Sequence, residues 1–335
     1  MDKGHRITLQ SYLYGIAIKA SATAILSLLL CTQAQGQSVN DLSRISPGFP
    51  VYSQYLQNGL MINPAYAGTR GVLSSLLSYR VQWMGTSGAP VIQSMSFHSP
   101  LKNDKVALGL MAQFMQYGAT KSTAVYADYA YHISLKRGRL SFGLKAGTDI
   151  SNTDYLGLKL IDANDPVFMS NDKPFVLPNA GAGIYYFEDR FFAGLSVPSF
   201  LGYHRTSSGS VVPFHSFSEY DFLVSGGAIF VVSPLLKIKP SFLVDYSLNK
   251  TRKLTQFDIN TNFIIADLVW AGASWRLSEQ VLVGIVQVQL NQQLMLGLSY
   301  NYPAGRMNTF SKGSTEFILR YEFRYKVSAA NPRYF

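Results

Sequence analysis

Residues 314–325 read Ser-Thr-Glu-Phe-Ile-Leu-Arg-Tyr-Glu-Phe-Arg-Tyr, and most neighbouring residues differ in polarity. Alternate positions are apolar, and the positions between them carry charge: Phe317, Leu319, Tyr321, Phe323 and Tyr325 oppose Glu316, Arg320, Glu322 and Arg324. A two-residue period places successive side chains on opposite faces of an extended chain. A helix would bring the four charges onto its apolar side, so this stretch predicts a β-strand with one apolar and one polar face.

The same alternation recurs along the chain and predicts fourteen strands in all. It is clearest in 122–135, 139–150 and 236–246, where lysine, aspartate and serine oppose leucine, phenylalanine and tyrosine. The remaining segments are 72–83, 91–98, 106–116, 179–187, 190–198, 220–232, 256–265, 269–276, 281–290 and 294–302. An even number of strands, each near ten residues long, is typical of an outer-membrane β-barrel.

The connections between these segments alternate in length. The tight ones are 99–105, 136–138, 187–189, 233–235, 266–268 and 291–293, and the long ones are 151–178, 199–219, 247–255 and 303–313. Outer-membrane barrels have short periplasmic turns and longer external loops, whereas a soluble β-sandwich gives no reason for such alternation. The sequence therefore predicts an all-β fold, a transmembrane antiparallel β-barrel of the outer membrane with about 14 strands. Both termini are expected in the periplasm.

The composition agrees with a wall that is apolar on one side. Of the 335 residues, 47% are hydrophobic and 14% are charged, whereas a soluble domain has about 25% charged residues. The apolar content excludes intrinsic disorder, and the single cysteine, Cys31, excludes an internal disulfide framework. The mean hydropathy of +0.08 is too low for a bundle of membrane helices. After residue 36, no apolar run approaches the 18 residues of a membrane-spanning helix.

The first 36 residues have the features of a cleaved signal peptide. Lys3, Arg6 and Lys19 precede the apolar run 20–30, and small residues follow at Ala34 and Gly36, with cleavage expected after Gly36. Lipidation of Cys31 is disfavoured because Leu30 stands where a small residue is needed. Four parts are expected: signal peptide 1–36, a periplasmic or plug segment 37–70, the barrel 71–326, and a periplasmic tail 327–335. We expect segment 37–70, together with loop 151–178, to plug part of the lumen.

Several motifs after the signal resemble the PorP/SprF family. The first is Tyr-Ser-Gln-Tyr at 52–55, followed by Asn-Gly-Leu at 58–60 and Asn-Pro-Ala-Tyr-Ala-Gly at 63–68. Further similar stretches are 80–83, 88–90, 93–100, 177–183 and 332–335. The resemblance points to a set of signature residues with a structural or partner-binding role: Tyr52, Gln54, Tyr55, Asn58, Asn63, Pro64, Tyr66, Gly68, Gln82, Trp83 and Pro90.

The resemblance implies an outer-membrane protein of the type IX secretion and gliding machinery of Bacteroidetes-type bacteria. It implies a non-enzymatic barrel that supports export, or attachment at the cell surface, of large cargo proteins such as adhesins. The implied partners are a cargo protein with a C-terminal sorting domain, periplasmic secretion-ring or peptidoglycan-associated components, and outer-membrane lipid. Composition and periodicity alone lead only to an outer-membrane barrel.

Two other functions stay open at this point. A porin or a hydrophobic-solute channel would use the lumen of the same barrel. A hydrolase would need His98 or His132, both on polar strand faces, beside a nucleophile and a carboxylate such as Ser96 and Asp128. No local nucleophile signature supports catalysis. The other histidines of the body, His204 and His215, fall in an expected external loop.

No cofactor, metal or nucleic-acid site is predicted. Asp258, Asn260 and Asn262 imitate half of a calcium loop, but Phe263 replaces the glycine and the closing glutamate is missing. Their spacing instead puts them on one strand face, as lumen lining. The longest basic cluster, 136–139, lies in a tight turn and forms no continuous stripe for nucleic acid. Strand charges are expected to form ion-pair ladders across the lumen.

Overall fold

The computed structural model describes residues 44–45, 53–102, 104–154, 174–205, 211–217, 220–248 and 254–323. The expected signal peptide, the tail 327–335, most of loop 151–178 and the signature residue Tyr52 lie outside these described residues. The proposed part boundaries and the location of the termini therefore stay predictions.

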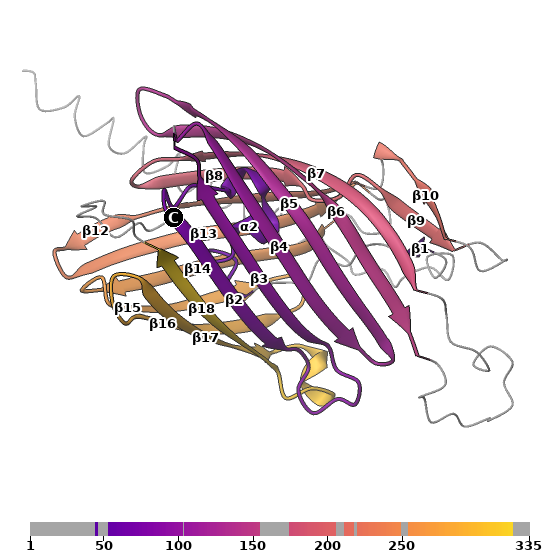
Figure 1. Ribbon diagram of the computed structural model, residues 1–335. Helices are drawn as coiled ribbons and strands as arrows, with labels where there is room; N and C mark the ends of the chain where they lie inside the picture. The colour runs from indigo at the N-terminus through magenta and orange to yellow at the C-terminus, as the bar shows by residue number, and fades with distance from the viewer. Residues whose placement is uncertain are drawn as a thin grey trace, which may run out of the picture. The chain divides into compact units, whose positions relative to one another are not determined.

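Fourteen antiparallel strands form one closed barrel (Figure 1). They are β2 (Leu73–Val81), β3 (Val91–Pro100), β4 (Val106–Tyr117), β5 (Thr120–Ser134), β6 (Arg139–Thr153), β7 (Phe175–Phe187), β8 (Phe191–Val197), β11 (Asp221–Ala228), β13 (Leu236–Ser247), β14 (Leu254–Ile265), β15 (Val269–Arg276), β16 (Val281–Gln289), β17 (Leu294–Pro303) and β18 (Ser314–Phe323). The first and last strands, β2 and β18, pair with each other, and β11 pairs with both β8 and β13. Closure leaves no edge of unpaired backbone groups, which hydrocarbon would penalise.

The fold prediction is confirmed, since each predicted segment contains a strand of the barrel. The one interruption is in segment 220–232, which the structure divides into β11 and β12 (Phe230–Ser233). Both pieces pair with β13, and the residue between them, Ile229, is buried and donates its N–H to Arg190 O at 2.8 Å. This segment therefore acts as one broken barrel strand, and the barrel keeps fourteen.

The alternation places polar side chains inside and apolar side chains outside. On β18, Glu316 is 0% exposed whereas Phe317 beside it is 42% exposed. On β6, Ser141 is 0% exposed and Leu144 is 59% exposed. A soluble protein would hide leucine and expose glutamate, so this reversed pattern is that of a barrel whose outer surface contacts lipid. None of the helices in the described part of the chain is both long enough and apolar enough to cross a membrane.

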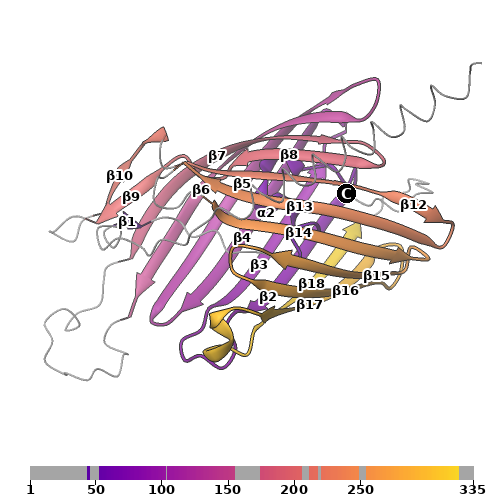
Figure 2. The same ribbon diagram turned by 180° about the vertical axis from the view of Figure 1, so that it is seen from behind.

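The excursion at 199–219 contains two strands that the period analysis missed. Strands β9 (Gly202–Arg205) and β10 (Val211–Phe214) form a small antiparallel sheet with β1 (Arg44–Ile45), separate from the barrel strands (Figure 2). Each strand has four residues or fewer, which is too short to show a period.

Residues 53–70 precede β2, and below they are called the plug. They contain two short helices, α2 (Gly59–Ile62) and the 3-10 helix η2 (Pro64–Tyr66). Figures 1 and 2 show α2 surrounded by the barrel strands. Apart from Leu56 and Ile62, every plug side chain is buried, and the inward faces of the strands provide their partners.

Candidate functional site

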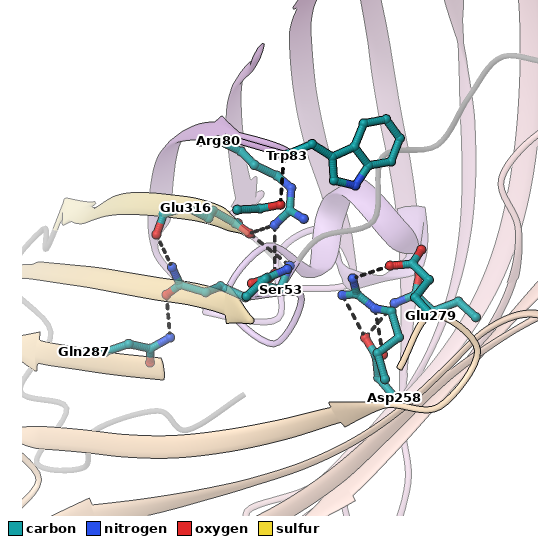
Figure 3. Close-up of polar contacts among 12 residues, drawn as sticks. Ser53, Arg80, Trp83, Asp258, Glu279, Gln287 and Glu316 are labelled. Atoms are coloured by element: carbon teal, nitrogen blue, oxygen red, sulfur yellow. Dashed lines mark hydrogen bonds and ion pairs between the residues drawn. The ribbon is translucent and has the colours of Figure 1, made fainter. Parts of the chain in front are cut away.

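The plug starts at a buried ion pair on neighbouring strands. Arg80 of β2 faces Glu316 of β18 in the sheet register, with 3.2 Å between Arg80 Nη1 and Glu316 Oε2. Ser53 joins both, because its backbone N–H donates to Glu316 Oε2 at 2.9 Å and its hydroxyl accepts from Arg80 Nη1 at 2.8 Å (Figure 3). The carboxylate thus neutralises the arginine and holds the plug backbone with one oxygen.

The next plug residues are held by amide and hydroxyl contacts. Gln54 Nε2 donates to Glu316 O at 3.1 Å, and Gln54 Oε1 accepts from Gln287 Nε2 of β16 at 2.9 Å. The Tyr55 hydroxyl lies 3.3 Å from Ser241 Oγ on β13. Burial raises the pKa of the Tyr55 phenol, so the hydroxyl stays protonated and available for this hydrogen bond.

Asn63 connects the plug to the far wall. Its Oδ1 accepts from Ala65 N at 2.9 Å and caps η2, while Pro64 fills the first helical position, where no N–H is needed. Its Nδ2 donates to Ile184 O on β7 at 3.0 Å and, more weakly, to Leu195 O on β8 at 3.4 Å. One side chain therefore both shapes the plug and attaches it.

Inward-facing glycines of the wall make room for this attachment. A Cβ at Gly143 of β6 would lie 2.1 Å from Ala65 N, and one at Gly183 of β7 would lie 2.1 Å from Asn63 Oδ1. Gly297 of β17 similarly faces Gln54 Oε1, at 2.5 Å from the Cβ position. Glycine within a strand often marks close approach of another backbone. The wall is thus shaped to receive the plug.

Two wall histidines hold the turn at Ala67 and Gly68. His132 of β5 donates from Nε2 to Ala67 O at 2.9 Å, and Gly68 N donates to His98 Nδ1 on β3 at 3.0 Å. Gly68 has φ +76°, and a Cβ there would lie 2.3 Å from Ala107 Cβ, so a larger residue fits neither the backbone nor the space. Tyr66 packs edge-on against the His98 ring, with 5.4 Å between centroids.

The plug ends at a second charged group on β18. Arg70 Nη2 lies 2.5 Å from Glu322 Oε1, and Arg320 Nε lies 3.5 Å from the same oxygen. Arg320 also donates to Gln57 Oε1 in the plug. Both ends of the plug are therefore attached to β18, while Asn63 in its middle contacts β7 and β8.

In the ring of fourteen strands, β8 lies seven places from β18. The plug consequently crosses the lumen to the opposite wall and returns. Within the described residues, its hydrogen bonds reach ten strands: β2, β3, β5, β6, β7, β8, β13, β16, β17 and β18.

The ion-pair arrangement differs from the expected ladders across the lumen. Arg80 with Glu316, and Arg276 with Asp258, are directly opposed residues on paired strands. Arg276 Nε lies 2.9 Å from Asp258 Oδ1, and its Nη1 contacts Glu279 at 3.2 Å (Figure 3). Such pairs join neighbouring strands because the plug occupies the space between opposite walls. Asp258 therefore lines the lumen and is paired with Arg276, in agreement with its predicted position on the polar face of the strand.

The signature residues fall into two groups. Gln54, Tyr55, Asn58, Asn63, Pro64, Tyr66 and Gly68 belong to the plug, whereas Gln82, Trp83 and Pro90 lie at the β2–β3 connection. There Gln82 N donates to Pro90 O at 2.9 Å, and Trp83, with φ 51°, donates its N–H to Ser314 Oγ at 3.1 Å. The predicted site residues did not include Arg80, Gly143 or Gly183. Arg80 and Gly183 nevertheless lie in stretches that resemble the family, and glycine at inward strand positions was a usable signal.

Both candidate catalytic histidines, His98 and His132, are engaged by the plug. One ring nitrogen of each histidine is occupied by the plug backbone, and neither carboxylate oxygen of Asp128 has a hydrogen-bond partner among the described residues. Across the described ranges, no three His, Cys, Asp or Glu side chains gather closely enough to hold a metal ion.

Fold and site together define a class, the outer-membrane-type β-barrel with an internal plug. Solved structures agree on the fold. The Ralstonia pickettii toluene transporter TbuX aligns with a TM-score of 0.51 at 11% identity, over 88% of this chain and 99% of that one. The CymD monoaromatic hydrocarbon channel aligns with a TM-score of 0.50 at 12% identity, over 85% of this chain and 95% of that one.

The particular family follows from the sequence. Residues 46–321 match the model of the type IX secretion system membrane protein PorP/SprF, and the chain belongs to that family. No curated protein sequence matches the chain. The protein is therefore a type IX secretion membrane component with an outer-membrane barrel fold. The matched range includes both the plug and the β2–β3 connection.

Proposed function

We propose that this barrel supports the export or cell-surface attachment of large cargo proteins, adhesins among them, that carry a C-terminal sorting domain. Membership of the PorP/SprF family supports a secretion role. The main support for the proposed mechanism is the plug, which contacts β18 at both ends and β8 in its middle. Because the plug occupies the lumen, a mechanism based on protein contacts at the ends of the barrel is favoured over conduction of solutes through the lumen.

The barrel offers two different ends for such contacts. One end has short turns, such as 234–235 and 266–268, and the other has the long connections, including the sheet of β1, β9 and β10. Under the outer-membrane pattern, the long end faces outward and would meet cargo. The short turns and the end of β18 would then face the periplasm, toward secretion-ring or peptidoglycan-associated components, whereas β1 lies with β9 at the long end.

Purification of the full chain from its native outer membrane in mild detergent tests this function. Identification of co-purifying proteins by mass spectrometry is expected to recover a large protein with a C-terminal sorting domain. Deleting the gene should remove that protein from the cell surface, and restoring the wild-type gene should return it. Recovery of a lone barrel, with unchanged surface cargo after deletion, would refute the proposal.

A second candidate is a channel for small or hydrophobic solutes. TbuX is a toluene transporter and CymD is a monoaromatic hydrocarbon channel, and both share the fold of this chain. Solute passage would require the plug to leave its contacts on β7 and β8. Swelling of liposomes that contain only this protein would favour the channel, and impermeable liposomes would favour the contact mechanism.

Two further properties belong to the proposal. The chain is inferred to be non-enzymatic, as the family description suggests. It is inferred to reach the outer membrane through signal cleavage after Gly36 or Ala34. Mass spectrometry of the mature amino terminus and fractionation of the envelope test the second point.

A further inference from the structure

The plug begins at the end of the barrel that has the long connections. Ser53, its first residue, donates from its hydroxyl to Asn301 Oδ1 at 2.8 Å and accepts from Arg80 Nη1. Asn301 lies two residues before the end of β17, and Arg80 lies one residue before the end of β2. The long connection 304–313 follows β17, and β2 ends where β18 begins because these two strands pair antiparallel. Ser53 therefore lies at the long-connection end.

The plug finishes at the opposite end, beside the short turns. Arg70 forms its ion pair with Glu322, one residue before the end of β18. Gly68 N donates to His98, two residues before the end of β3, and the short turn 101–105 follows that strand. The chain then enters β2 within three residues. The plug therefore passes along the length of the barrel, from the long-connection end to the short-turn end, as well as touching opposite walls.

The residues before the plug lie at the long-connection end as well. β1 pairs antiparallel with β9, and Arg44 lies opposite His204. β9 belongs to the long connection between β8 and β11. Eight residue steps join Ile45 to Ser53 and span at most about 29 Å, so β1 lies within short reach of the plug. The contacts of β1 and those of Ser53 thus agree on the same end.

We propose that the chain threads the barrel once before its first strand, so that β1 lies at the cell surface while the end of β18 faces the periplasm. The assignment of outside and inside rests on the proposed function, in which the long connections face outward. Fourteen strands alone return the chain to the end where β2 begins. The plug adds one further passage, which puts β1 on the other side of the membrane. The sequence-based expectation of two periplasmic termini counted the strands and not this passage.

Threading gives the outer surface a covalent connection to the plug. The sheet of β1, β9 and β10 lies at the end with the long connections, and the chain of β1 continues to Ser53. Ser53 holds Glu316 through its N–H and Arg80 through its hydroxyl. A movement of β1 at the cell surface would therefore act on the first contacts of the plug without any partner entering the lumen.

Cysteine labelling on intact cells tests the placement of β1. The single cysteine, Cys31, precedes the expected cleavage after Gly36, so the mature wild-type chain should not be labelled. Arg44→Cys is the reporter, and Ile45→Cys presents the opposite face of the strand if position 44 is shielded. With a polyethylene-glycol maleimide too large to pass through porins, we expect labelling in β1 without permeabilisation of the outer membrane.

Two control positions define the ends of the barrel. Phe310→Cys, at a residue 72% exposed in connection 304–313, should be labelled on intact cells. Leu235→Cys, at a residue 67% exposed in the turn between β12 and β13, should be labelled only after permeabilisation. Labelling at 310 on intact cells, but at neither β1 position until permeabilisation, would overturn the threading and leave the cargo proposal standing. Labelling at 235 on intact cells, with 310 protected, would overturn the surface placement.

A disulfide tests the pairing of β1 with β9 independently of orientation. Opposed residues on paired strands are about 5 Å apart, whereas residues two strands apart are separated by about 10 Å, beyond the reach of a disulfide. Arg44→Cys with His204→Cys should therefore form a reducible cross-link in the native outer membrane, seen on a non-reducing gel. The matched control is Arg44→Cys with Val212→Cys, because Val212 lies opposite His204 on the far side of β9. Absence of the 44–204 cross-link, or equal cross-linking in both variants, would overturn the inference.

Discussion

Replacing Gly143 by alanine tests whether the plug is seated as the structure shows. The new Cβ would lie 2.1 Å from Ala65 N, 2.4 Å from Pro64 C and 2.5 Å from Ala65 Cα. All three are backbone atoms, so no side-chain rotation can relieve the overlap. Since real Cβ contacts essentially never fall below 3.0 Å, β6 and the plug would have to separate by 0.9 Å at Ala65 N.

The expected cost follows from this displacement. Overpacking of a close contact costs about 1–3 kcal/mol, and each weakened buried hydrogen bond adds about 1 kcal/mol. The bond at risk is that from Ser141 Oγ to Ala65 O, at 2.7 Å. We therefore expect the seated plug to lose about 2–4 kcal/mol, which lowers the ratio of closed to open barrels roughly 30- to 1,000-fold.

Single-barrel conductance in planar lipid bilayers measures this ratio. The control is Gly284→Ala on β16, because a Cβ at Gly284 meets nothing within 4 Å. Wild type and Gly284→Ala should stay closed, whereas Gly143→Ala should show frequent openings and a lower melting temperature. If Gly143→Ala is as closed and as stable as the control, the plug does not rest on β6 and the reasoning fails.

Three further predictions concern the wall and its contacts. Arg80→Met leaves Glu316 buried without its cation and should lower the free energy of unfolding, measured in urea, by about 3–5 kcal/mol. The double variant Arg80→Met, Glu316→Leu should recover most of that loss. Equal losses in the single and double variants would contradict this prediction. Leu144 is expected to face lipid, so Leu144→Arg should destabilise the barrel in vesicles by up to about 2–4 kcal/mol. The control Leu101→Arg, in the turn after β3, should change the stability little. Similar losses of stability in both variants would argue against a lipid-facing β6. His132→Ala removes the donor to Ala67 O and should cost about 1–3 kcal/mol, seen as a lower melting temperature, while an ester hydrolysis lost only in this variant would support a catalytic histidine instead.

The sequence predicted the wall well because each strand carries its own pattern. Glu316 and Phe317 differ in polarity, and the structure places them on opposite sides of β18. The same local rule located the remaining strands and the short turns. It failed for β9 and β10, since four residues contain too few alternations to distinguish a strand from a loop.

The contacts of the plug could not be predicted in this way. Ser53 and Glu316 are 263 positions apart, and their meeting depends on closure of the ring between β2 and β18. Periodicity states that Glu316 faces inward but not what it meets there. For the same reason, the charges were expected to pair across the lumen, whereas a directly opposed residue on the next strand, such as Arg80, was nearer.

The positions of the anchors constrain how the lumen could open. Ser53 and Arg70 hold the two ends of the plug to Glu316 and Glu322 on β18, and residue 70 continues within three residues into β2, which pairs with β18. The β18 side of the plug is therefore fixed both by its covalent continuation into β2 and by the contacts with the buried carboxylates Glu316 and Glu322. The attachment at β7 and β8 is different, because it consists of neutral hydrogen bonds: Asn63 donates to two wall carbonyls, and Ser196 Oγ of β8 donates to Ile62 O. Charged hydrogen bonds are stronger than neutral ones. An opening movement would therefore start at Asn63 and swing the middle of the plug toward β18, without releasing its ends.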